Sequence, residues 1–484
     1  MRCPRAPTIL IILALAAAPL APAAGQGTPP ANATAGKLVL STKSADAKAE
    51  FWKGLEYWQT GAYTDGVTHF RRAYAIDNGF ALAHVFSMGE YDARAHQADL
   101  DRAVGDAARQ SMQEGLLAMF WREKALGHWP EDKALLRAAM QLMPNEPFPA
   151  VEYLWASTAD GTKATQALDT AHAFIARYPS YAPLSFVGVY LTMISGDTAG
   201  AFRAAEDYAR NYPNTGVAYG YYGAILQQAG RYDDAAAIYR KGMSLSMHPD
   251  YGWDPASALA EMYVLRGRYT DARAVATEAL ARARDASDSA TYMAEIASTW
   301  FATGDNQRGM QLLEQARQRS ATVGGVQNPV PVDYILAEAS ALVGNVSATR
   351  SYLARMRPET ANDSAILYAN YAGDYGYAGQ LDSALAYTDR MASVKGVPWT
   401  AGAAHHTRAV ALAAAKQCSR ARTELAQAPD TASLEILLTR AGCELESGNR
   451  AVALSLRDRA IASPEIVLFD PVYVRQRVRL AQMK

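Results

Sequence analysis

Apolar residues recur along the chain with the period of an α-helix, and a glycine interrupts this pattern at regular intervals. Proline residues repeat at a similar interval, at Pro144, Pro179 and Pro213. A repeat of this length accommodates two helices, so the pattern predicts a chain of consecutive helical hairpins. The glycines stand 34 to 40 residues apart, with an apolar helical pattern before and after each: Gly196, Gly230, Gly267, Gly304, Gly344 and Gly379.

The stretch YYGAILQQAGRYDDAAAIYRKGM shows how one unit is built. Gly230 can adopt the left-handed conformation that ends the first helix without a Cβ clash. Gly223 and Ala235 are small enough to let the two helix axes approach closely, and Tyr239 fills the space beside them. In several units the residue after the turn glycine is a good N-cap for the second helix: Asp197, Asp305, Asn345 and Asn449.

These units resemble the tetratricopeptide repeat. The resemblance implies an all-α protein, an α-α superhelix in which about eleven or twelve hairpins stack into a right-handed solenoid. Weaker copies centre on Gly304, Gly344, Gly379 and Gly448, and a copy around Lys416 has lost its turn glycine. The three closest copies are Lys53–Asp77, Tyr219–Met243 and Ala258–Leu280.

The repeat pattern divides the chain into segments. Residues 47–319 are expected to form an N-terminal half of the solenoid and residues 332–462 a C-terminal half, with a bend at the insert ATVGGVQNPVP between them. Between Ala81 and Met112 no turn glycine stands at the expected place, so longer or differently connected helices are expected there. Residues 463–484 are expected to form a helix whose apolar side caps the open end of the solenoid.

The first residues have the character of a targeting segment. Arg2 and Arg5 precede a short apolar run and a stretch of small residues, which predicts a signal peptide over residues 1–25; an uncleaved anchor is the alternative. Cys3 lies in the charged leader and not at the cleavage site, so no lipoprotein anchor is expected. Residues 26–46 have the composition of a disordered linker. The mature protein is therefore expected to be periplasmic or secreted, without a membrane span.

The chain of 484 residues carries 47 basic and 48 acidic residues, which leaves no excess of positive charge for a nucleic-acid backbone. We find no zinc-hydrolase motif, nucleophile elbow, P-loop or dinucleotide fingerprint, and the adjacent His405 and His406 point in different directions on a helix. No cofactor, metal or catalytic residue is therefore expected. Cys418 and Cys443 come close in the repeat register and form either a disulfide or two buried thiols.

The resemblance implies that partners, mostly peptide segments of other proteins, bind along the concave groove lined by the first helices. The family's clamp for acidic chain ends is missing, because Tyr57 stands one turn after Lys53. The alternative for the aromatic candidates is a place in the core. By register the groove candidates are Phe51, Leu55, Trp58, Phe186, Tyr190, Met193, Glu261, Phe301, Tyr334 and Tyr377.

The sequence thus favours a non-enzymatic scaffold that binds a protein or peptide. Two alternatives remain: an enzyme or accessory subunit acting on cell-wall or extracellular glycans, and a solenoid that self-associates. Two carboxylates about 5–10 Å apart in one pocket would favour the glycan enzyme.

Overall fold

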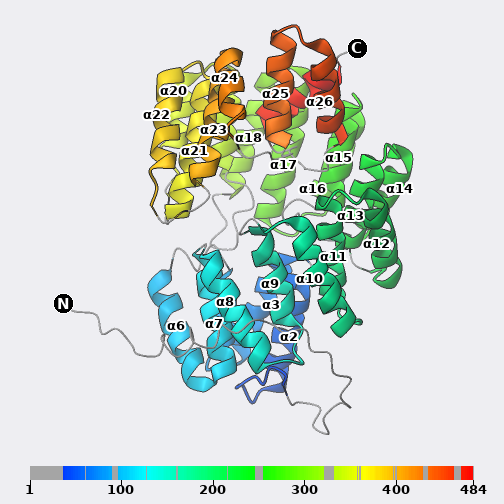
Figure 1. Ribbon diagram of the computed structural model, residues 1–484, viewed down its shortest axis with the longest axis vertical. Helices are drawn as coiled ribbons and strands as arrows, with labels where there is room; N and C mark the ends of the chain where they lie inside the picture. Colours follow the sequence, from blue (N-terminus) through cyan, green and yellow to red (C-terminus); the bar gives the residue numbers. More distant parts are fainter. Residues whose placement is uncertain are drawn as a thin grey trace, which may run out of the picture. The chain divides into compact units, whose positions relative to one another are not determined.

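The computed structural model describes residues 36–482, apart from 60, 90–95, 127, 160–161, 215, 246–253, 321–331, 357, 359–360, 396, 398–399, 429–433 and 463–469. The expected signal peptide and the Gly- and Pro-rich insert lie outside the described residues. All regular elements of the described part are helices, which confirms the all-α fold of stacked hairpins (Figure 1). Two compact units divide the chain, Met1–Asn211 and Tyr212–Lys484.

In the first unit the described helices are α2 (Ala45–Gln59), α3 (Tyr63–Ile76), α4 (Ala81–Ser87), α6 (Gln97–Gln110), α7 (Met112–Ala125), α8 (Trp129–Leu142), α9 (Phe148–Ala159), α10 (Ala164–Arg177), α11 (Ala182–Ile194) and α12 (Thr198–Asn211). Neighbours in sequence pack on one another, and α2 also contacts α9.

In the second unit they are α13 (Gly216–Gln228), α14 (Tyr232–Met243), α15 (Pro255–Leu265), α16 (Tyr269–Ala281), α17 (Ala286–Thr303), α18 (Asn306–Ser320), α19 (Val332–Leu342), α20 (Val346–Leu353), α21 (Ala361–Tyr377), α22 (Leu381–Ala392), α23 (Thr400–Ala414), α24 (Cys418–Leu425), α25 (Leu434–Glu446), α26 (Arg450–Ala462) and α27 (Pro471–Ala481).

The turns follow the predicted glycine pattern. All six glycines of the repeat have φ angles between 71° and 86°, and Gly61 and Gly448 also have positive φ angles, of 88° and 80°. Lys416 takes the same left-handed conformation with φ of 60°, so the copy that lost its glycine kept the turn. Of the four predicted N-caps, Asp197, Asp305 and Asn345 accept a bond from the backbone three residues on.

Aromatic side chains from α2, α4, α7 and α9 form the core of the first unit. The ring of Trp121 lies 4.5 Å from that of Trp58 and 4.3 Å from that of Phe86, and Phe51 and Phe148 complete the cluster. All five side chains are buried. The first helices of this unit therefore pack on one another through large rings. Between Ala81 and Met112, where longer or differently connected helices are expected, α4 is only seven residues long, and Gly89 has a positive φ angle of 61°.

The predicted disordered linker is wrong for its last residues, because residues 36–44 have an ordered place in the first unit. Leu38 and Leu40 are buried, and the backbone N–H of Leu38 donates to Glu146 over 3.3 Å. The N–H of Ser41 donates to Glu114 over 2.7 Å. Two buried leucines and two buried carboxylate acceptors therefore fix a segment whose composition alone indicates disorder.

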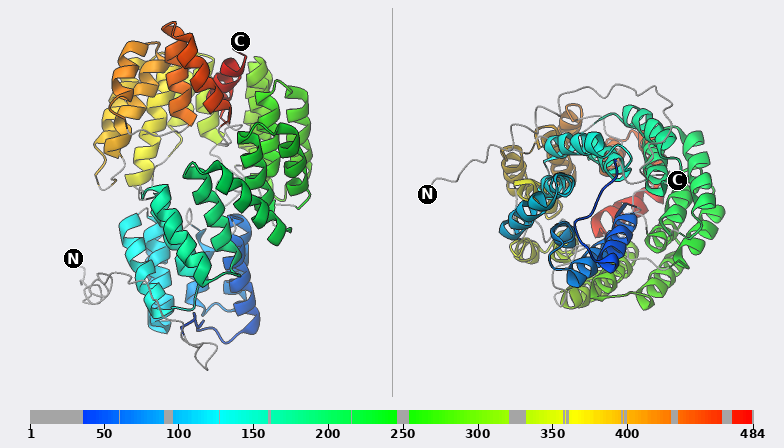
Figure 2. Two further views of the ribbon diagram at one scale, coloured as in Figure 1. Left: turned by 45° about the vertical axis from the view of Figure 1, so that its right-hand side comes forward. Right: turned by 90° about the horizontal axis from the view of Figure 1, so that it is seen from below.

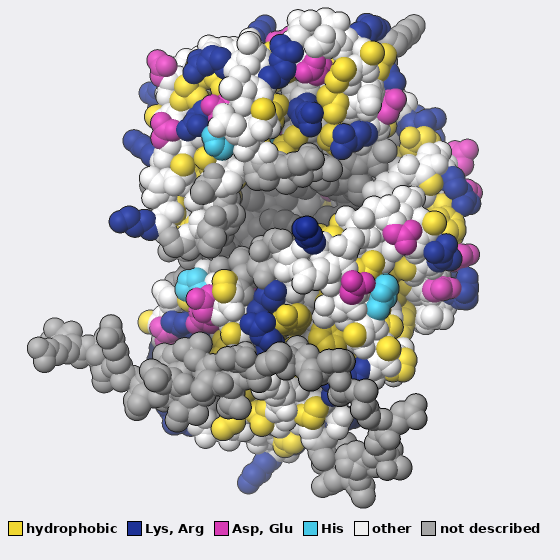
Figure 3. Space-filling view, viewed as in Figure 1, with side chains coloured by type: hydrophobic (Ala, Val, Ile, Leu, Met, Phe, Trp, Pro, Cys, Tyr) yellow, Lys and Arg dark blue, Asp and Glu magenta, His cyan; other side chains and the backbone are white. Residues whose placement is uncertain are grey.

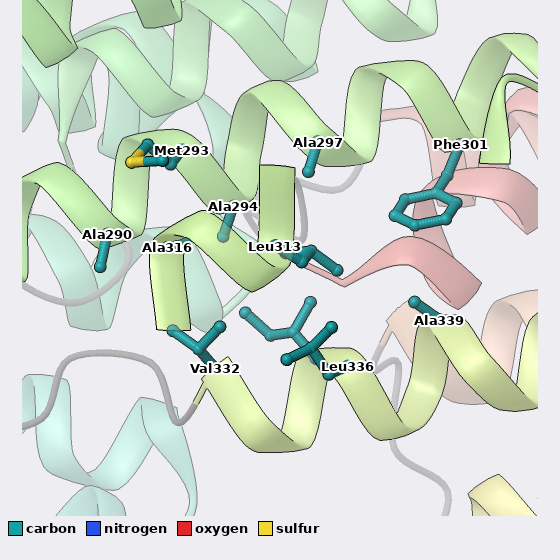
Figure 4. Close-up of a cluster of buried hydrophobic side chains, with 11 residues drawn as sticks. Ala290, Met293, Ala294, Ala297, Phe301, Leu313, Ala316, Val332, Leu336 and Ala339 are labelled. Atoms are coloured by element: carbon teal, nitrogen blue, oxygen red, sulfur yellow. The ribbon is translucent and has the colours of Figure 1, made fainter. Parts of the chain in front are cut away.

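The predicted break between two solenoid halves does not coincide with the division into units. Helices α17, α18 and α19, which lie on both sides of the insert, share one buried cluster that includes Phe301, Leu313, Leu336 and Ala339 (Figure 4). Hairpins on the two sides of residues 321–331 are thus stacked in one core. The division falls instead between Asn211 and Tyr212.

The C-terminal helix α27 does not only cap the last hairpin. It packs on α25 and α26, as expected for a cap, but also on α15, α17 and α19. In the right-hand view of Figure 2 the red helix accordingly lies inside the arc of the green and yellow helices of its own unit. The first helices of four hairpins, α15, α17, α19 and α25, therefore meet one helix that follows all of them in the chain.

Candidate functional site

The candidate binding site of the second unit is the surface that α27 covers. We call it the inner face and define it by Glu261 of α15, Glu295 of α17, Glu338 of α19, Asp374 and Tyr377 of α21, and Glu435 of α25. Val472, Val474, Val478 and Leu480 of α27 are buried against the unit. An amphipathic helix thus lies in a groove of helices, which is one of the ways in which proteins recognise peptides.

Polar contacts hold α27 along its whole length. Near its start, the hydroxyl of Tyr473 donates to Glu435. In the middle, Gln476 donates to the hydroxyl of Tyr377 over 2.7 Å. Further along, Arg477 pairs with Glu261 and donates from Nη2 to the carbonyl of Ala460 over 2.8 Å.

Arg477 is the cation of α27 that is buried within the described unit. Only 1% of its side chain is exposed, and 4% of the side chain of Glu261. Breaking such a pair on one side leaves an uncompensated charge in the interior, which costs about 3–5 kcal/mol. Arg479, two residues after Arg477 on the same helix, is exposed. The contrast makes Arg477 the side chain on which the docking of α27 depends most.

A cluster of carboxyl groups lies at the N-terminal end of α27. Asp470 caps the helix by accepting from the N–H of Tyr473 over 2.8 Å. Burial and the neighbouring Glu435 raise the pKa of Asp470 to about 7, although its hydrogen bonds lower it. Burial and then Asp470 raise the pKa of Glu338 well above its ordinary value. Burial and then Asp470 raise the pKa of Asp374 as well.

A second acidic cluster lies on α15 and α17. Asp254 caps α15 by accepting from Ser257 over 2.9 Å, and Ser257 donates its hydroxyl to Glu295. Burial raises the pKa of Glu295 well above its ordinary value, and Asp254 and Glu261 raise it further. Within the described residues, one oxygen of Glu295 and one of Asp374 have no hydrogen-bond partner. The inner face therefore offers more acceptors than α27 satisfies.

A cavity of about 270 Å³ opens beside α27. The disulfide between Cys418 and Cys443, whose Cα atoms are 5.0 Å apart, forms part of its wall. Arg475 and Arg479 line the cavity, and Glu446 is the one acidic residue of its lining. Two other cavities of the second unit are also lined by one carboxylate each. None of these three cavities brings two carboxylates together, which is the arrangement that a glycan-cleaving site requires.

Five of the ten predicted groove residues are in the core, which corrects the expectation that they form an open surface. At most 2% of each of these side chains is exposed, because each packs among the rings or small residues of neighbouring helices. Tyr190 and Met193 are partly exposed, and the ring of Tyr190 lies 5.2 Å from that of Trp155. The five core residues are Phe51, Leu55, Trp58, Phe186 and Phe301.

The remaining three predicted residues lie at the inner face. Glu261 pairs with Arg477, Tyr377 accepts from Gln476, and Tyr334 donates to Glu338. Sequence reasoning missed the acidic residues at positions 338, 374 and 470. A signal for them existed, since each is an acid within an otherwise apolar helical stretch or at its N-cap.

Other features of the described residues add no chemistry to the site. They contain no group of three or more His, Cys, Asp or Glu side chains placed so that it could hold a metal ion. Over the same residues, no helix has both the length and the apolar character needed to cross a bilayer. On the face shown in Figure 3, single basic and acidic side chains are scattered among apolar and polar ones.

No family model matches the chain, and no curated protein matches it. Among solved structures, the human IFIT1 dimer with PPP-AAAA is similar at 13% identity and a TM-score of 0.39, over 87% of this chain and 95% of that one. The APC/C hetero-tetramer Cut9–Hcn1 has 13% identity and a TM-score of 0.37, over 86% and 76%. Yeast Tom70 has 12% identity and a TM-score of 0.37, over 90% and 95%.

Proposed function

We propose that this protein is an exported, non-enzymatic scaffold that binds a helical segment of a partner protein on the inner face of residues 212–484. One observation carries the proposal: the inner face already holds a helix, α27, through apolar contacts and a buried ion pair. A surface that binds one amphipathic helix can bind another of similar pattern. In this view α27 is an intramolecular occupant of the site.

Export rests on the predicted signal peptide over residues 1–25 and is supported by the Cys418–Cys443 disulfide. Disulfides persist in oxidising compartments outside the cytosol. Mass analysis of the protein recovered from the periplasm or medium of an expressing bacterial-type cell would show a chain beginning near residue 26. A chain found only in the cytosol with residues 1–25 intact would contradict this part of the proposal.

The binding test uses a peptide of residues 470–484, labelled at its N-terminus, and the full chain with Arg477→Ala. The variant weakens the docking of α27 and so opens the site. Fluorescence anisotropy is expected to show one peptide bound per chain, and much weaker binding to the parent, in which α27 is tethered at an effective concentration in the mM range.

Arg479→Ala is the matched control, because it removes an exposed arginine from the same helix. It is expected to behave like the parent. Circular dichroism of the Arg477→Ala chain shows whether the helices persist. A folded Arg477→Ala chain whose α27 amides exchange rapidly with solvent but which binds no peptide would refute the proposal.

Self-association is tested by the same proteins. If a second copy supplies its α27 to the inner face, light scattering of the Arg477→Ala chain would show dimers, and the parent would be a monomer. None of the three cavities described above holds paired carboxylates, so we do not propose the glycan-cleaving alternative.

A further inference from the structure

The charges of the inner face do not match those of the helix that covers it. Arg477 is the buried cation of α27, His406 has its Nε2 3.2 Å from Glu435, and the half-buried Arg475 of α27 donates to Asn306 of α18 and not to one of these acids. Asp470 of α27 adds a further acid. The inner face itself carries five acidic side chains: Glu261, Glu295, Glu338, Asp374 and Glu435.

The mismatch is visible at individual atoms. One oxygen of Asp374 and one of Glu295 are buried without a hydrogen-bond partner among the described residues. A buried carboxyl oxygen normally has a donor, and leaving it without one is unfavourable. The side chain of Gln476 reaches α21 by donating to Tyr377, which lies about one turn from Asp374. Position 476 of α27 is therefore where a cation would face the acid of α21.

We propose that the inner face is built for a partner helix richer in cations than α27: a basic, amphipathic helical segment of another protein, for which α27 is the weaker intramolecular competitor. This inference rests on the proposed function, because it names the kind of partner that the inner face binds. The apolar side of such a partner occupies the positions of Val474 and Val478, and its additional arginine or lysine side chains pair with Asp374 and Glu295.

Two properties favour this partner over an uncharged helix. Burial raises the pKa of the carboxyl groups of Glu295 and Asp374, and a cation brought alongside would lower the pKa of each group and form charge-assisted hydrogen bonds with it. An acidic helix would add like charges to a buried acidic surface, which disfavours it strongly. Charge complementarity therefore selects the partner, while the apolar contacts are shared with α27.

The experiment compares two labelled peptides on the full chain carrying Arg477→Ala. One has the native sequence of residues 470–484, and the other carries Gln476→Arg. The arginine peptide is expected to bind at least about tenfold more tightly, and the difference is expected to shrink as salt is added. Hydrogen exchange on the parent chain, at saturating arginine peptide, is expected to show the amides of its own α27 becoming exposed.

Asp374→Asn, introduced into the same chain, identifies the acid that is responsible. It is expected to abolish most of the tenfold preference, whereas Asp382→Asn, an equal change of charge at an exposed position of α22, is expected to leave it intact. If Arg477→Ala does not fold, Gln476→Ala in the chain replaces it, because it removes only the hydrogen bond to Tyr377.

The outcomes separate the two proposals. Equal binding of both peptides overturns the preference for a basic partner and leaves the inner face as a helix-binding site. A preference that survives Asp374→Asn also overturns the inference, because the charge would then act elsewhere. If neither peptide binds to a folded chain whose α27 is open to exchange, the proposed function fails together with the inference.

Discussion

The close packing of α13 against α14 can be tested by adding one methyl group, with Gly223→Ala. A Cβ atom added at Gly223 would lie 2.4 Å from Cε1 of Tyr239 and 2.5 Å from its Cδ1. The ring cannot easily move aside, because Tyr239 is 1% exposed and its hydroxyl donates to Gln227 over 3.2 Å. Gly223→Ala therefore forces two packed helices apart.

The expected magnitude combines two opposing effects. Replacing a helical glycine by alanine stabilises a helix by about 0.5–1 kcal/mol. Forcing extra atoms into a packed interior costs about 1–3 kcal/mol. We expect Gly223→Ala to lower the free energy of unfolding by about 1 kcal/mol, and Gly223→Leu to lower it by more.

Gly373 provides the matched control. It lies within α21, and a Cβ added there would meet no heavy atom within 4 Å. Gly373→Ala should therefore raise the free energy of unfolding by about 0.5–1 kcal/mol. Urea unfolding followed by far-UV circular dichroism measures both variants. The opposite signs are the diagnostic result, and two alanine variants that are stabilised equally would refute the packing described for α13 and α14.

Three further predictions concern single features of the fold. Lys416→Gly should raise the free energy of unfolding by about 1 kcal/mol, because a left-handed turn favours glycine, and a decrease in urea midpoint would contradict this. Acidification should stabilise the protein: burial raises the pKa of Asp132 and of Asp470 from 3.8 to about 7, so their contribution is complete below about pH 4 and is lost as the pH rises through 7. A melting temperature that is higher at about pH 8 than at about pH 5 would contradict that sign. Reducing the Cys418–Cys443 disulfide, which spans 25 residues, should cost about 3 kcal/mol, and an unchanged melting temperature in reductant would show that the bond contributes nothing.

The repeat was readable from the sequence because its signals are local. A turn glycine such as Gly267 must take a positive φ angle, and an N-cap such as Asn345 acts on the backbone three residues away. Both requirements hold whatever the rest of the chain does. The all-α fold and the hairpin boundaries followed from them, and even the exception at Lys416 was visible as a missing glycine.

The site could not be read in the same way because it depends on contacts between distant residues. Glu261 and Arg477 are 216 positions apart, and no period in the sequence connects them. The aromatic groove candidates failed for a related reason. Phe51 and Trp58 have the spacing of a helix face, but spacing does not tell whether that face meets a ligand or the rings of Phe86 and Trp121.

The helix α27 follows in the chain all the helices that it covers, and this order sets the sequence of folding steps. Until α27 emerges from the ribosome, or from the export machinery that we propose, the acids of the inner face are in contact with water. Carboxyl groups in water are ionised at neutral pH, and a charged surface disfavours aggregation with other incomplete chains. We therefore expect the chain to remain soluble before α27 is made, and α27 to cover the inner face in one late step.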